Sequence, residues 1–167
     1  MAVTRDIVAA WRRPRKVMRR LLAQGQREDR ALVFLMLGCT MIALSQVPRM
    51  VRAIEMGTGG PFEQQLGGVI LAWLFLVPLA LYALAAASHL VARMFGGKGA
   101  FHSARLALFW SLLAVSPLWL LAGLIEGYFG SAATISQVFG LVAVSWFFYL
   151  WIAGYTEVEW GKQEAAA

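Results

Sequence analysis

The sequence alternates long apolar stretches with short polar ones, as a chain that crosses a bilayer several times does. A spanning helix needs roughly 20 mostly apolar residues to cross about 30 Å of hydrocarbon. Four stretches meet this requirement: residues 31–47, 66–91, 106–125 and 136–155. Helices satisfy their own backbone hydrogen bonds inside lipid. The pattern therefore predicts an all-α fold, a polytopic integral membrane protein with four transmembrane helices between residues 31 and 155.

The N-terminal segment, residues 1–30, has a different pattern, with apolar and cationic positions on opposite faces of a helix. The apolar face holds Val3, Ile7, Ala10, Trp11, Pro14, Val17, Met18, Leu21 and Leu22, and the cationic face holds Arg5, Arg12, Arg13, Lys16, Arg19 and Arg20. Such a helix places its apolar side at the acyl boundary and its cations against anionic headgroups. Proline is costly inside a helix but suits its first turn, so we expect a break at Pro14 and a second helix that begins there.

The composition agrees with a membrane location. Of 167 residues, 60% are hydrophobic and 14% are charged, whereas a soluble domain has roughly 45–50% and about 25%. An ordinary cytosolic domain and a disordered chain are both excluded. The single cysteine, Cys39, lies in an apolar run and is expected to be a buried, inert thiol. The cysteine and histidine pattern predicts no metal site and no cofactor.

The distribution of basic residues predicts the orientation. Nine Lys and Arg residues precede the first span, three lie between the second and third spans, and one lies in the tail, against two between the first and second spans. The positive-inside rule then places both termini in the cytoplasm, including a tail of residues 156–167. Arginine far outnumbers lysine, which is typical of a GC-rich bacterial genome, so the expected location is the bacterial inner membrane.

Several cations are candidates for contact with anionic phospholipids. They are Arg12, Arg13, Lys16, Arg19 and Arg20 on the N-terminal helix, and Lys98 and Arg105 near the third span. Alternatively, the N-terminal cations act only as the topology signal. Nucleic acid is not an expected partner, because the opposite face of the helix is apolar and suits lipid.

Two prolines and a histidine interrupt the apolar spans. Pro78 and Pro117 lie near the middle of the second and third spans and should kink them. Paired interruptions can also mark a transport site, but no carboxylate accompanies them at that depth. His89 lies near the inner end of the second span, where a simple hydrogen bond is expected rather than a haem or pigment ligand.

Residues 93–105 form the most distinctive polar connection. Gly96, Gly97 and Gly99 permit a tight turn between two spans. The turn is either a compact hairpin with basic anchors or a small anion site, in which backbone amides and Lys98 bind a lipid phosphate.

Two segments resemble the Yip domain family. They are residues 95–121, FGGKGAFHSARLALFWSLLAVSPLWLL, and the basic helix at residues 6–25, DIVAAWRRPRKVMRRLLAQG. The resemblance implies a multi-span membrane protein. Eukaryotic relatives bind Rab GTPases and one another, whereas the bacterial branch consists of inner-membrane proteins without an established reaction. The family usually has five spans, and four are expected here.

No catalytic motif is present, since the sequence lacks a nucleophile with its base, a P-loop and a dinucleotide fingerprint. We therefore expect no enzyme, but a scaffold or accessory subunit of a larger membrane complex. The candidate contact residues for a partner or lipid are Trp11, Trp146, Phe147 and Trp151. The expected partners are other integral membrane proteins or a second copy of the chain. The alternative is a small transporter or channel built on the two proline-containing spans.

Overall fold

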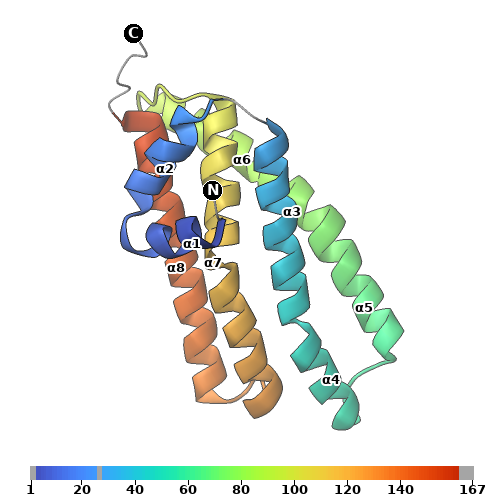
Figure 1. Ribbon diagram of the computed structural model, residues 1–167. Helices are drawn as coiled ribbons and strands as arrows, with labels where there is room; N and C mark the ends of the chain where they lie inside the picture. Colours follow the sequence, from blue (N-terminus) through green and yellow to red (C-terminus); the bar gives the residue numbers. More distant parts are fainter. Residues whose placement is uncertain (1–2, 26–27, 162–167) are drawn as a thin grey trace.

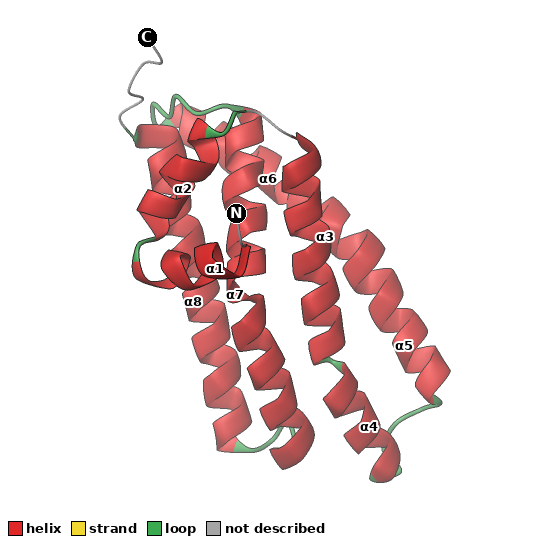
Figure 2. Cartoon of the chain, viewed as in Figure 1, coloured by secondary structure: helices red, strands yellow, loops and turns green. Residues whose placement is uncertain are grey.

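The computed structural model describes residues 3–25 and 28–161. Within these residues all of the regular structure is helical (Figures 1 and 2). The elements are α1 (Val3–Arg12), α2 (Pro14–Ala23), α3 (Glu28–Ser45), α4 (Val47–Glu55), α5 (Phe62–Leu71), the π-helical turn η1 (Ala72–Leu76), α6 (Val77–Met94), α7 (Phe101–Phe129) and α8 (Thr134–Trp160). The all-α fold class is confirmed.

Four segments of the described chain are long and apolar enough to cross a membrane. They are Glu28–Glu55 (α3 with α4), Phe62–Met94 (α5, η1 and α6), α7 and α8. The four apolar stretches of the sequence lie within these segments. The last helix continues beyond its expected end to Trp160, so the predicted tail begins as helix, and residues 162–167 of that tail lie outside the described residues. The molecule is a multi-pass membrane protein.

The spanning segments run alternately up and down, which gives the bundle two ends. The basic end carries the last turn of α2, the first turn of α3 and the loop of residues 95–100. The distal end carries the connections of residues 56–61 and 130–133. Figure 1 shows the basic end at the top, with the α1–α2 hairpin on the outer side of α7 and α8.

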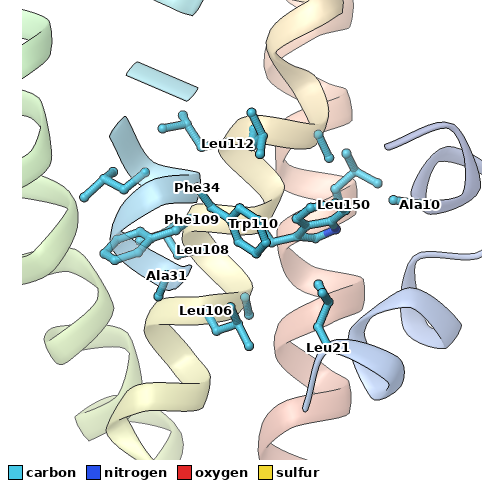
Figure 3. Packing of buried hydrophobic residues seen from close by; sticks show 14 of the residues in the cluster. Ala10, Leu21, Ala31, Phe34, Leu106, Leu108, Phe109, Trp110, Leu112 and Leu150 are labelled. Carbon is cyan, nitrogen blue, oxygen red and sulfur yellow. The ribbon is translucent and has the colours of Figure 1, made fainter. Parts of the chain in front are cut away.

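Helix α7 is the centre of the bundle and packs against α3, α4, α6 and α8. Its side chains from Leu106 to Ser116 are buried without interruption. On this stretch Trp110 packs edge-to-face on Phe34 of α3, with ring centroids 5.0 Å apart (Figure 3). Phe109 packs in the same way on Tyr82 of α6, at 4.9 Å. This is the favoured geometry for aromatic pairs, and it joins three helices in one core.

Two glycines allow α3 and α4 to approach α7 closely near the distal end. A Cβ on Gly123 would overlap the carbonyl group of Ser45, and a Cβ on Gly127 would overlap Pro48. The two glycines are four residues apart, so they lie on one face of the helix, as in the small-residue motifs that pack membrane helices.

Both prolines within the spans are accommodated by local hydrogen bonding. Before Pro78 the helix widens into η1, where the N–H of Val77 donates to the carbonyl of Ala72, five residues earlier. Pro117 lies inside α7 and cannot donate to the carbonyl of Leu113. The hydroxyl of Ser116 donates to that carbonyl instead, at 2.8 Å.

Candidate functional site

The N-terminal segment forms a helical hairpin that packs on the bundle. Helix α1 ends at Arg12 and α2 begins with Pro14 in its first turn, so the break predicted at Pro14 is confirmed. The apolar side chains of Ala10, Val17, Met18 and Leu21 are buried in the core of the protein. The apolar face of the hairpin therefore contacts α7 and α8, where the sequence suggested contact with lipid.

A tryptophan and a glycine explain this docking. The indole N–H of Trp11 donates to the backbone carbonyl of Ala114 on α7, at 2.7 Å, and its ring packs edge-on against Trp146 of α8. Higher up, Gly154 of α8 leaves room for the end of the Met18 side chain. An amphipathic pattern specifies only that one face avoids water, and here the protein core covers that face.

Two ion pairs also hold the hairpin in place, one between α2 and α8 and one between α2 and α1. The guanidinium of Arg19 lies 2.5 Å from the carboxylate of Glu157 on α8, and Arg20 lies 3.3 Å from Asp6 on α1. Both acidic side chains are largely buried, whereas the arginines remain 68% and 51% exposed. Pairs with one exposed partner contribute modestly to stability, so their main effect is to fix the hairpin's orientation.

The remaining cations of the hairpin point outward. Arg12, Arg13, Arg15 and Lys16 are exposed, and none has an ion-pair partner within residues 3–25 and 28–161. Together with Arg19 and Arg20, they form the outer basic face of the hairpin. Five of these six residues are the ones expected from the sequence to contact lipid headgroups.

The loop of residues 95–100 encloses the carboxylate of Glu159. The backbone N–H of Gly99 donates to Oε2 of Glu159, and the N–H of Lys98 donates to its backbone carbonyl, both at 3.0 Å. A Cβ on Gly97 or Gly99 would lie 2.7–2.8 Å from the same carboxylate, so close approach requires glycine at both positions. The anion that the Gly99 amide binds in the structure is therefore a side chain of the protein.

The same carboxylate meets His89. Nδ1 of His89 on α6 lies 2.7 Å from Oε1 of Glu159 on α8, and both side chains are almost fully buried. The ring of Phe101 covers the histidine, with centroids 4.2 Å apart. The expected hydrogen bond of His89 is present, but sequence reasoning missed Glu159 as its partner because it placed that residue in the tail.

The two predicted headgroup contacts near the third span have different surroundings. The Lys98 side chain is exposed at the basic end. Arg105 is three-quarters buried, pairs with Glu28 at 2.7 Å, and its guanidinium lies 5.8 Å from the ring centre of Tyr82. Arg105 therefore joins α3, α6 and α7.

The aromatic side chains of α8 line the bundle and a groove on it. Trp146, Phe147 and Trp151 are partly buried and pack against the core. Trp151 also lines an open groove of about 380 Å³ between α6 and α8, whose lining is almost entirely apolar. This volume is within the usual range for small-molecule sites.

A second groove, of about 450 Å³, lies between α4 and α5 near the distal end. Its polar lining comes from Gln46, Arg49 and Gln65. Neither groove is lined by Pro78 or Pro117. Among the described residues, no group of three or more His, Cys, Asp or Glu side chains is placed to hold a metal ion.

Comparison with known protein families shows to which family the chain belongs. A family model for the Yip1 domain matches residues 8–167. The chain belongs to the Yip1 domain family. No curated protein and no solved structure matches it.

The Yip1 domain match confirms the resemblance seen in the sequence and includes all of the candidate contact residues, from Trp11 to Trp151. Because the match begins at residue 8, within α1, it includes the second half of α1 and all of α2. In this Yip1 chain the described residues provide four membrane-length segments, and the hairpin packs on their outside.

Proposed function

We propose that this Yip1 domain protein is a non-enzymatic scaffold or accessory subunit of a larger complex in the bacterial inner membrane. The observation that supports this role is the exposure of the second spanning segment. Phe75 and Leu79 are 64% and 70% exposed, and other large apolar side chains along α5, η1 and α6 are exposed as well. Helix α7 buries most of its side chains, whereas the second spanning segment is the least buried of the four.

The second spanning segment also presents small residues. Gly67 and Gly68 of α5 have nothing within 4 Å of the position where a Cβ would lie. Small residues let membrane helices approach closely, and packing drives their association. In Figure 1 the α5 end of this segment lies at the edge of the bundle, on the far side of α3 and α4 from α7 and α8, and a helix of a partner membrane protein or of a second copy can pack against it there.

The proposed orientation has both termini and the basic end in the cytoplasm. The outer basic face of the hairpin and Lys98 then lie where anionic phospholipids are available, and lipid headgroups are the proposed partners of these cations. Reporter fusions within residues 93–105 and after Lys162 should report cytoplasm, and a fusion near Gly60 should report periplasm. A periplasmic C-terminus would overturn this orientation.

Copurification in mild detergent at native expression tests the scaffold role. We expect a larger complex, which Gly68→Leu should dissociate because a larger side chain there occupies the contact surface, and a Cβ at this position has nothing within 4 Å. Gly140→Leu is the matched control, since Gly140 on α8 also has open space around it. Migration of the native chain only as a monomer would contradict the proposal. Solute flux into liposomes above that of empty vesicles would favour the transporter alternative instead.

A further inference from the structure

The α1–α2 hairpin meets the bundle halfway between its two ends. Ala114, which accepts the hydrogen bond from Trp11, lies thirteen residues after the start of α7 and fifteen before its end. At 1.5 Å per residue, Trp11 is therefore about 20 Å from either end of the helix. Figure 1 shows the same relationship, with α1 crossing α7 and α8 near the middle of their length.

The charge pattern of α3 and the start of α4 independently places the docking point of α1 at the middle of the bundle. Its uncharged run extends over residues 31–48 and has an arginine on each side. Gly38, near the middle of this run, faces α7 so closely that a Cβ would lie 3.2 Å from the backbone nitrogen of Leu113. Ala114 is the next residue, so α1 docks level with the centre of the uncharged part of the bundle.

From this depth to the basic end, the outer surface of the hairpin carries only positive charge. Arg12 and Arg13 lie at its lower end, Arg15 and Lys16 follow on the first turn of α2, and Arg19 and Arg20 lie above them. Within residues 3–25 the acidic side chain is that of Asp6. This side chain points inward, since the residue is only 8% exposed, and it pairs with Arg20. The outer basic face therefore has no carboxylate of its own hairpin beside Arg12 or Arg13.

Such a face is incompatible with a surrounding of acyl chains. A charged side chain near the bilayer centre is costly for each residue, whereas a bilayer adjusts its thickness at a small cost per ångström. Long cationic side chains can reach toward the interface, but one side chain is much shorter than the distance of about 20 Å from Trp11 to the end of α7. Four cations that have no ion-pair partner among the described residues therefore favour a change in the bilayer over insertion into it.

We infer that the leaflet at the basic end dips along the α1–α2 hairpin, so that anionic phospholipid headgroups and water reach α1 at the mid-height of the bundle. The cations of α2 form a continuous path from the basic end down to Arg12, and phosphate oxygens match the guanidinium fork. The inference rests on the headgroup contact proposed above for these cations. It adds local thinning of one leaflet as an activity of this chain.

Spin labelling of the full chain in vesicles tests this inference. A nitroxide at Val8→Cys reports on α1, where Val8 is 65% exposed, and a nitroxide at Val144→Cys reports on an exposed position of α8 two residues from Trp146. In vesicles of phosphatidylglycerol and phosphatidylcholine, we expect collisions with a water-soluble nickel relaxant to be at least fivefold more frequent at position 8 than at position 144. The ratio of the collision frequencies at positions 8 and 144 should be smaller in vesicles of pure phosphatidylcholine. An equal ratio in both kinds of vesicle would overturn the preference for anionic lipid.

Charge variants and a distance measurement complete the test. Replacing Arg12, Arg13, Arg15 and Lys16 by glutamine should bring position 8 within twofold of position 144, whereas Arg49→Gln with Arg93→Gln, two exposed cations outside the hairpin, should leave the fivefold difference unchanged. Equal nickel access at both positions in the parent chain would overturn the inference. A broad distribution of distances between labels at positions 8 and 144 would also overturn it, because the hairpin would then have left the bundle.

The native thiol of Cys39 and the lipid-only vesicles both bear on how the labelling results are interpreted. Cys39 is fully buried, so labelling at position 8 is performed both with Cys39→Ala and with the native thiol, in case the substitution impairs folding. The vesicles contain no other protein. A failure of this test therefore leaves the copurification test of the scaffold role unaffected.

Discussion

His89 and Glu159 join α6 to α8 through a contact of 2.7 Å between Nδ1 and Oε1, with side chains 2% and 0% exposed. Because Glu159 also accepts a hydrogen bond from the N–H of Gly99, the pair holds the connection between α6 and α7 as well. Three segments that are distant in the sequence thus meet at one carboxylate. Buried ionisable groups are stable only when such partners satisfy them.

Removing this carboxylate should destabilise the protein strongly. Glu159→Ala leaves the buried His89 and the partly buried Gly99 N–H without their acceptor, and we expect a loss of about 3 kcal/mol in the free energy of unfolding. Glu159→Gln should cost less, because its amide oxygen still accepts a hydrogen bond. Thermal unfolding in mild detergent measures the effect, with Glu63→Gln on exposed α5 as the control. An unchanged melting temperature for Glu159→Ala would contradict this role.

The close approach of α3 and α4 to α7 should depend on Gly123. Gly123→Ala must push the carbonyl of Ser45 away, and overpacking of this kind costs about 1–3 kcal/mol. Gly140→Ala adds the same methyl group on α8 where nothing lies within 4 Å, so it should be nearly neutral. The two variants are compared by unfolding in detergent. If they were equally stable, the glycine contact would contribute nothing to packing.

Ser116 should matter only while Pro117 is present. In the native chain its hydroxyl replaces the amide that Pro117 lacks, so Ser116→Ala should cost about 1 kcal/mol. In a Pro117→Ala background the amide at position 117 can donate to Leu113, and Ser116→Ala should cost close to nothing. A double-mutant cycle of unfolding free energies measures the coupling. Additive effects of the two substitutions would show that the hydroxyl does not compensate for the proline.

Cys39 should report on the integrity of the core. It is a free thiol with 0% exposure, as its place in an apolar run predicted. We expect a maleimide to leave it unmodified in the folded protein in mild detergent and to label it completely after unfolding in sodium dodecyl sulfate. Rapid labelling of the folded chain would show that α3 separates from the core.

The sequence predicts the helices of this protein much better than their contacts. Apolar length alone identifies the four spanning segments, and the fixed geometry of Pro14 identifies where α2 begins. Neither property indicates what the apolar face of α1 contacts, because lipid tails and a protein core both exclude water from it. The docking of Trp11 on the carbonyl of Ala114 depends on the packing of α1 against α7, which only the folded bundle presents.

The sequence also contains local signals for two further contacts, the packing of α7 on α3 and α4 and the burial of Glu159. Gly123 and Gly127 have the four-residue spacing of close helix packing. Glu159 follows Tyr155 by four residues, so it continues the face of α8 and does not begin a solvated tail. The identity of its partner was inaccessible, since His89 is seventy residues away in the chain.

The π-helical turn η1 accommodates one extra residue in the second spanning segment. A regular α-helix bonds each N–H to the carbonyl four residues earlier, whereas in η1 the N–H of Val77 bonds to the carbonyl of Ala72, five residues earlier. Because the wider turn absorbs the extra residue, α6 keeps nearly the rotation relative to α5 that an uninterrupted α-helix one residue shorter would give it. A deletion within α6 before His89 would instead turn His89 by about 100° relative to η1 and away from Glu159. The second span should therefore tolerate the loss of one residue in this turn far better than the same loss in α6.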